Sequence, residues 1–283
     1  MRYTTALSSA LLASTAFALP TAEQMSERRH QRLAERLSKP SGQRFGSTSR
    51  PLAPNTISQS DFIAVPNNTK EVTYSSNWAG AVIESSGITT VTGTFTIPTV
   101  KEPSGGSSST EYGAAAWVGI DGNQCGSAIL QTGVEFFVEG TQTAYQAWYE
   151  WYPDYSYNFP SFPVSPGQQI QATVHATSKT SGTAVLKNLS TGKSVTHTFS
   201  NEGGTGSLCE TDAEWIVEDF QSGSALVPFA NFGSVTFTGA SYTHGGTTSG
   251  VSGASIIDVQ QNGKVETNCG VSGSSTVTCT YQN

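Results

Sequence analysis

The sequence predicts an all-β fold, an antiparallel sandwich or barrel, and two observations support this prediction. From residue 72 onward, short runs of alternating apolar and polar residues recur about every ten residues, separated by Gly, Ser, Pro and Asn. No convincing helix lies between these runs, and a composition rich in Thr, Val, Tyr and Gly favours strands and turns over helices. Because no motif repeats with a period of roughly 20–50 residues, a propeller or a solenoid is not expected.

In chain order, strands are predicted at residues 78–84, 88–97, 112–121, 128–138, 142–152, 169–177, 182–189, 193–199, 212–220, 233–239, 254–261 and 275–281. Successive side chains of a strand point to opposite faces of a sheet, so every second residue lies on one face. In four of these strands one face carries acids, an amide or large aromatic rings in place of the Ser, Thr and Lys of an ordinary exposed face. The residues on these faces are Trp117, Gly119 and Asp121; Gln131, Gly133 and Glu135; Trp148, Glu150 and Tyr152; and Glu214, Ile216 and Glu218. If the four faces coincide, they line a groove for a polymer, either a polypeptide or a polysaccharide.

The N-terminal part of the chain differs from the rest in charge. Residues 1–60 carry 8 Lys and Arg against 3 Asp and Glu, whereas residues 61–283 carry 6 lysines, no arginine and 18 Asp and Glu. Residues 1–18 are predicted to be a secretory signal sequence, because a positive start and an apolar stretch precede a small-residue cleavage pattern. Residues 19–70 are predicted to be a basic propeptide and linker, and residues 71–283 the functional domain of a secreted protein.

Opposite charges suggest how the propeptide works. We expect it to dock on the acidic domain as an intramolecular inhibitor at neutral pH, and to detach when the carboxylates become protonated. A disordered arm that only improves solubility is the alternative. Because the domain is acidic and lacks arginine, no nucleic-acid partner is expected. No membrane association is expected either, because no apolar run after residue 20 approaches the roughly 20 residues that span a bilayer.

The four cysteines are predicted to form two disulfides, since an even number in a secreted chain favours bridges over metal binding or catalysis. Three pairings are possible. Cys269 and Cys279 flank a hairpin-like segment, which favours pairing them with each other and leaves Cys125 for Cys209. Asn67 and Asn188 begin glycosylation motifs.

The remaining chemistry is that of carboxylates. The sequence has no HExxH, no GxSxG, no Asp-Thr-Gly and no phosphate-binding glycine loop, so no metal and no cofactor are expected. The chain contains four histidines, and we expect them to be solvated rather than catalytic: His30, His175, His197 and His244. An ordinary Glu, with a pKa near 4.3, suits catalysis in acid with little tuning.

Four motifs resemble the glutamic peptidases (eqolisins) of fungi: AAWVGIDG at 115–122, AILQTGVEF at 128–136, AWYEWYPDY at 147–155 and CETDAEWIVEDF at 209–220. SSNWAGAVI at 75–83 is similar to the start of the mature enzymes, so the resemblance covers nearly all of residues 72–283. It implies a sandwich of two large bent antiparallel sheets, similar to legume lectins and some glucanases (concanavalin A-like). It also implies an acid endopeptidase that pepstatin does not inhibit and that acts on polypeptides, expected here as a monomer.

The resemblance implies that Gln131 and Glu214 are the catalytic pair. Glu214 would take a proton from water and return it to the leaving amine, while the neutral amide of Gln131 would stabilise the oxyanion and orient the water. Other residues match family positions that bind substrate or support the pair: Trp78, Trp117, Asp121, Trp148, Glu150 and Tyr152. Two residues depart from the family pattern, Gln146 and Glu135, each in place of an Asp.

Two other functions fit a sandwich with such a groove. A retaining glycosidase needs two carboxyl groups about 5–5.5 Å apart. The strand at 212–220 offers only Glu214 and Glu218 with Ile216 between them, which fits that requirement poorly. A non-catalytic lectin-like module would leave the signal sequence and the propeptide without an explanation.

Overall fold

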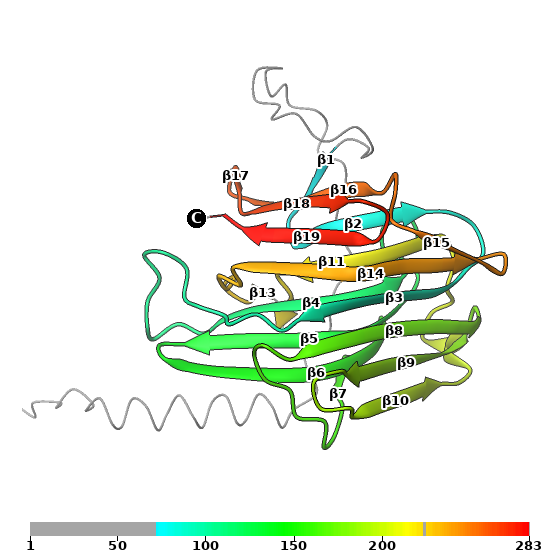
Figure 1. Ribbon diagram of the computed structural model, residues 1–283, viewed down its shortest axis with the longest axis horizontal. Helices are drawn as coiled ribbons and strands as arrows, with labels where there is room; N and C mark the ends of the chain where they lie inside the picture. The colour runs from blue at the N-terminus through cyan, green and yellow to red at the C-terminus, as the bar shows by residue number, and fades with distance from the viewer. Residues whose placement is uncertain (1–71, 223–224, 283) are drawn as a thin grey trace, which may run out of the picture.

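Two stacked β-sheets form the protein (Figure 1). The structure is a computed structural model that describes residues 72–222 and 225–282. The predicted signal sequence, the predicted propeptide and Asn67 lie outside the described residues. No helix in the described part of the chain has the length and apolar character that crossing a membrane requires.

The larger sheet has nine strands in the order β1-β16-β2-β11-β4-β5-β6-β7, with β17 paired to β16. All its pairings are antiparallel except that of β1 with β16. Its strands are β1 (Val72–Ser75), β2 (Trp78–Glu84), β4 (Tyr112–Ile120), β5 (Ile129–Glu139), β6 (Gln142–Tyr152), β7 (Tyr157–Asn158), β11 (Asp212–Glu218), β16 (Ser255–Gln261) and β17 (Lys264–Val265).

The smaller sheet has eight strands in the order β10-β9-β8-β3-β14-β19-β18, with β15 paired to β14. Its strands are β3 (Ile88–Thr96), β8 (Gln169–Ser178), β9 (Ser181–Asn188), β10 (Ser194–Phe199), β14 (Ser234–His244), β15 (Thr247–Gly250), β18 (Thr267–Ser272) and β19 (Thr276–Tyr281). A short hairpin of β12 (Gln221–Ser222) and β13 (Ala225–Leu226) stands apart, and the 3₁₀ turn η1 covers Glu202–Gly204.

The predicted fold is confirmed. Every predicted strand is present with ends that differ by a few residues, and the two sheets form a sandwich. Strands β1, β15 and β18 were not predicted, nor were the two-residue strands. Both predicted disulfides are present, Cys125–Cys209 and Cys269–Cys279.

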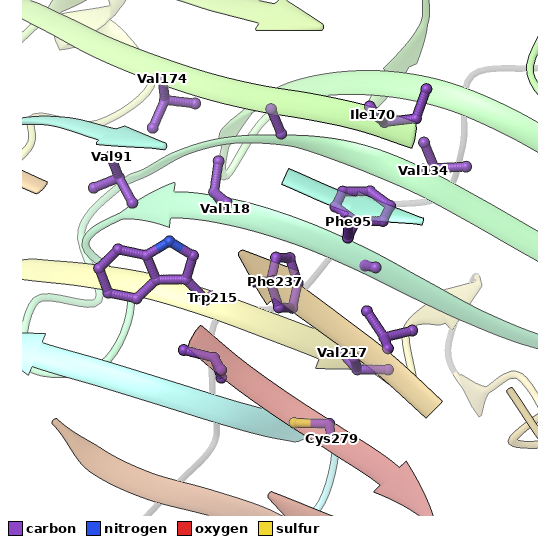
Figure 2. Packing of buried hydrophobic residues seen from close by; sticks show 14 of the residues in the cluster. Val91, Phe95, Val118, Val134, Ile170, Val174, Trp215, Val217, Phe237 and Cys279 are labelled. Carbon is purple, nitrogen blue, oxygen red and sulfur yellow. The ribbon is translucent and has the colours of Figure 1, made fainter. Parts of the chain in front are cut away.

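The main core fills the space between the sheets (Figure 2). Phe95 and Phe237 of the smaller sheet pack edge to face, with 5.3 Å between ring centroids, and Trp215 of the larger sheet is fully buried with them. The indole Nε1 of Trp215 donates to the carbonyl of Thr92 at 2.8 Å, so this large ring leaves no unsatisfied polar atom in the core. Residue 215 points inward, and alternation therefore turns Glu214 to the opposite face of the sheet.

A second cluster of buried side chains covers the opposite, outer face of the larger sheet. It contains Trp78, Val82, Ala115, Trp117, Ile129, Phe137, Ala144, Trp148, Ile216, Phe220, Val227 and Ile257. The predicted alternation is therefore correct: the four acid- and aromatic-bearing faces coincide on this outer face. The fold thus brings together residues as far apart in the sequence as Trp78 and Ile257.

Candidate active site

One row of residues crosses the outer face from strand to strand. The pairing register aligns Glu214 on β11 with Gly119 on β4, and aligns Gly119 with Gln131 on β5. The same row continues to Val82 on β2 and to Glu150 on β6. Because neighbouring strands lie about 4.8 Å apart, the backbones of Gln131 and Glu214 are separated by about 10 Å, with the glycine between them.

The absence of a side chain at Gly119 makes room for two neighbouring side chains, Trp117 and Glu214. A Cβ atom at this position would lie 2.8 Å from Cζ3 of Trp117 and 3.1 Å from Oε2 of Glu214. The first of these distances is shorter than van der Waals contact, so a larger residue would have to displace the indole ring. A strand residue without a side chain therefore lets Trp117 and Glu214 approach each other over the backbone.

The amide of Gln131 is oriented by a neighbouring carboxylate. Its Nε2 donates to Oε2 of Glu150, with 3.3 Å between the two atoms. Its Oε1 is buried and has no hydrogen-bond partner in the described part of the chain. An amide carries two N–H groups and one carbonyl oxygen, so the second N–H and the oxygen remain for a ligand.

Glu214 lies fully buried, and neither of its carboxylate oxygens has a hydrogen-bond partner in the described residues. Burial raises the pKa of this carboxyl well above its usual value, and the negative charges of Asp212 and Asp121 raise it further. The backbone N–H of Asn123 makes no hydrogen bond of normal geometry to Glu214, and its attraction for the carboxylate opposes this rise in pKa only partly. Glu214 therefore differs from an unperturbed Glu, because the surrounding sheet removes this group from water.

Asp121 supports the strand that carries Glu214. It has a positive φ of 68° at the end of β4, and its side chain turns toward the chain segment that precedes β11. Its two oxygens accept hydrogen bonds of 2.7 to 3.2 Å from the backbone N–H groups of residues 209, 210, 211 and 212. The disulfide between Cys125 and Cys209 ties the same two segments together. These bonds point to support of the pair, one of the two roles expected for Asp121, rather than to substrate contact.

Asp212 is a further buried acid next to this segment. Its Oδ2 accepts hydrogen bonds from the backbone N–H groups of Gln124 and Cys125 at 2.8 and 3.3 Å. Burial raises its pKa to about 6 despite these bonds. Asp212 was not among the predicted site residues, although its place two residues before Glu214 puts both on one face of β11.

The four predicted aromatic residues all lie on or beside the outer face. Trp78, Trp117 and Trp148 are fully buried there, and Tyr152 packs against the cluster at its margin. The rings of Trp78 and Trp117 meet edge to face with centroids 4.9 Å apart. Burial, together with the charge of Glu150, raises the pKa of Tyr152. These rings surround the Gln131–Glu214 row with apolar surface.

A second polar row lies four residues along the strands. It aligns Trp78 on β2, Glu218 on β11, Ala115 on β4, Glu135 on β5 and Gln146 on β6. The two residues that depart from the family pattern, Glu135 and Gln146, are thus direct cross-strand partners. In the first row β5 carries a glutamine and β6 a glutamate, whereas in this second row β5 carries a glutamate and β6 a glutamine.

The histidines of the described residues lie away from both rows. His175 bonds Thr90, and His244 bonds Ser85. His197 stacks on Tyr149 with ring centroids 3.9 Å apart, so it is packed rather than freely solvated. No group of three or more His, Cys, Asp or Glu side chains in the described part of the chain has the arrangement of a metal site.

Comparison with known proteins agrees with this geometry. The sequence pattern of the peptidase A4 family matches residues 76–281. The chain belongs to the peptidase A4 family. It is therefore a glutamic peptidase, a hydrolase, and a glycosidase or lectin function is not favoured.

Relatives of this A4 peptidase are similar over most of its length. Aspergillopepsin-2 of Aspergillus niger is 50% identical over 295 aligned positions, covering 99% of this chain and 100% of the relative. Scytalidopepsin B of Scytalidium lignicola is 47% identical over 221 positions, covering 76% of this chain and 81% of that protein.

Solved structures of related peptidases share the fold. Scytalido-glutamic peptidase with a transition state analog inhibitor aligns with a TM-score of 0.67 and 43% identity, covering 73% of this chain and 98% of that one. Aspergilloglutamic peptidase from Aspergillus niger aligns with a TM-score of 0.58 and 59% identity, covering 60% of this chain and 99% of that one. The two-sheet sandwich is thus common to this A4 peptidase and to its solved relatives.

Proposed function

We propose that this A4 peptidase is a secreted acid endopeptidase in which Glu214 and Gln131 are the catalytic pair. The observation that carries the proposal is the row across the outer face, where both side chains flank Gly119. One relative was solved with a transition state analog inhibitor, which supports assigning hydrolysis of polypeptide substrates to the same fold. The basic charge of residues 1–60 and the acidic charge of residues 61–283 support secretion of the protein as a precursor.

In the proposed reaction, ionised Glu214 removes a proton from water, whose oxygen attacks the carbonyl carbon of the peptide bond. The free N–H of Gln131 donates to the developing oxyanion while its Oε1 accepts from the water. Glu214 then transfers the proton to the amide nitrogen, the C–N bond breaks, and an acid and an amine leave.

The raised pKa of Glu214 is compatible with this role. A carboxyl whose pKa is raised by burial is a stronger base once it is ionised. A water molecule and a substrate that donate hydrogen bonds to the carboxylate would favour its ionised form and lower its pKa on binding. Trp78, Trp148, Glu150 and Tyr152 are proposed to contact the substrate or to hold the pair.

Two substitutions test the catalytic assignment. Gln131→Ala removes one oxyanion donor, which typically costs about 10²–10³ in rate. Glu214→Gln removes the base, which is expected to cost about 10²–10⁴ in rate. Gln171→Ala on the smaller sheet and Glu202→Gln in the η1 turn are matched controls and should keep full activity. Each variant should unfold near the wild-type temperature, which shows that a loss of activity is not a loss of folding. Full activity of Gln131→Ala or of Glu214→Gln would refute the assignment.

Activation is tested on the full precursor. We propose that its basic residues 19–70 inhibit the acidic domain at neutral pH and are lost in acid. The purified precursor is acidified, the loss of its first 60–75 residues is followed, and digestion of casein is measured with pepstatin present. Hydrolysis of a β-glucan without proteolysis would contradict the proposal.

A further inference from the structure

The indole ring of Trp117 connects the two polar rows of the outer face. Its Nε1 donates to Oε2 of Glu218 with 2.9 Å between the atoms, and both side chains are buried. The opposite, benzo edge of the ring reaches Gly119, where Cζ3 lies 2.8 Å from the site of a Cβ atom. One end of the ring is therefore bonded in the Glu218 row, and the other end lies in the row of the proposed catalytic pair.

The ring is also confined from the side. Trp78 packs edge to face against it, with 4.9 Å between ring centroids. Trp78 cannot fix the ring's orientation by polar contact, because its own Nε1 has no hydrogen-bond partner in the described residues. The directional bond to Glu218 is thus the contact that selects one rotation of the Trp117 ring over others that the apolar cluster would tolerate.

We propose that Glu218 is a positioning residue for peptide hydrolysis, and that it acts by holding the Trp117 ring over Gly119, the residue that separates Glu214 from Gln131 in the row. The proposal rests on the proposed function of that pair. In this place the ring edge packs over Gly119 and next to the carboxylate of Glu214, where it would help to fix the position of that carboxylate for the reaction. It also supplies part of the apolar surface that keeps bulk water from Glu214. Displacing catalytic groups by about 1 Å can cost about 10²-fold in rate.

The hydrogen bond from Trp117 to Glu218 can persist in acid. A carboxylate accepts the indole N–H through either oxygen, and a protonated carboxyl still accepts through its carbonyl oxygen. Titration of Glu218 therefore does not release Trp117. The acids that share the surroundings of Glu214 and this ring are Asp212 on β11, Asp121 at the end of β4, Glu150 on β6 and Glu135 on β5.

The experiment compares Glu218→Gln, which retains an acceptor oxygen, with Glu218→Leu, which does not. Peptide hydrolysis is measured as kcat and KM across the pH range, together with the unfolding temperature. Glu218→Gln should stay within about threefold of wild type, whereas Glu218→Leu should lose about 10–100-fold in kcat with little change in KM. In Glu218→Leu, water should reach Glu214 and lower its pKa. The arm of the pH–activity profile that depends on Glu214 should therefore shift toward lower pH.

A double-substitution cycle tests whether Glu218 acts through Trp117. Trp117→Phe removes the indole N–H, and adding Glu218→Leu to it should cost little further activity. Trp215→Phe is the matched control: it removes the indole bond to Thr92 on the core face, and should lower stability without moving the pH profile. Trp117→Phe also keeps the proposal testable if Glu218→Leu does not fold.

The outcomes separate this proposal from the catalytic assignment. If Glu218→Leu or a folded Trp117→Phe keeps the wild-type kcat and pH profile while Glu214→Gln is inactive, the positioning role is refuted and the catalytic pair stands. Independent, multiplying losses in the double variant would also refute it. An active Glu214→Gln would instead overturn the proposed function.

Discussion

Asp219 should make the fold less stable as the pH rises. This residue directly follows β11 and is almost fully buried. One of its oxygens accepts a hydrogen bond from Nε2 of Gln261 at 2.6 Å, and its other oxygen has no partner in the described part of the chain. Burial is the main cause that raises its pKa from 3.8 to about 8, and the charges of Glu218 and Glu266 add to it.

The direction of the stability change follows from proton linkage. Because the pKa of Asp219 is higher in the folded state than in the unfolded chain, folding keeps a proton that the unfolded chain releases above pH 3.8. The contribution of Asp219 to the free energy of unfolding is fully present below pH 3.8, and it is lost as the pH rises toward the folded pKa of about 8. At 1.36 kcal/mol for each pH unit, about 4 kcal/mol of unfolding free energy disappears between pH 4 and pH 7.

Asp219→Asn removes the titration and keeps an oxygen to accept from Gln261. The variant should match the wild type near pH 3 and exceed its stability by about 4 kcal/mol at pH 7. For a domain of about 200 residues that difference corresponds to a rise of roughly 10 °C in Tm. Thermal and urea unfolding at several pH values would measure it, with the exposed Asp154→Asn as the control. A stability difference that is the same at pH 3 and pH 7 would refute this reasoning.

Three further substitutions probe the supports of the site. Gly119→Ala should fold but lose about 10–100-fold in kcat, because its Cβ would push Trp117 aside; unchanged kcat would show that the ring's position is unimportant. Asp121→Asn replaces one acceptor oxygen by an amide that faces backbone N–H groups, and should lower the free energy of unfolding by about 2–4 kcal/mol in urea titrations. Removing the Cys125–Cys209 bridge, which spans 84 residues, should cost about 4–5 kcal/mol in the same assay, and a loss under 1 kcal/mol would contradict the loop-entropy argument.

Local sequence patterns predicted the fold where strands alternate clearly, and failed where a strand depends on a distant partner. The segment at Thr267–Ser272 contains Asn, Gly and Ser and resembles a loop, yet it pairs in register with β19, so that Cys269 lies directly opposite Cys279. Strand β1 is only four residues long and pairs in parallel with β16, which lies far along the chain. Neither pairing leaves a periodic signal in its own segment.

Alternation predicted which side chains share the outer face, but not the electrostatics of that face. Alternation placed Gln131 and Glu214 on one face, because period two is a local property of a strand. The pKa of Glu214 depends on how deeply β11 lies within the sheet and on Asp212, which requires the assembled structure. The role of Asp121 depends on its positive φ and on the backbone of a segment about ninety residues away. The bond from Trp117 to Glu218 likewise joins two strands whose alignment no short motif specifies.

The exchange of amide and acid between the two polar rows has a physical reason. Two carboxylates directly opposite each other on neighbouring strands repel one another, whereas an amide opposite a carboxylate forms a hydrogen bond. In the first row Gln131 faces Glu150, and in the second Glu135 faces Gln146, so neither row sets acid against acid across β5 and β6. The amide of Gln131 therefore allows a buried carboxylate beside it, and it keeps one N–H that the proposed mechanism assigns to the oxyanion. A second acid at that position would compete with Glu214 for a proton, which is why the proposed mechanism works with a neutral partner.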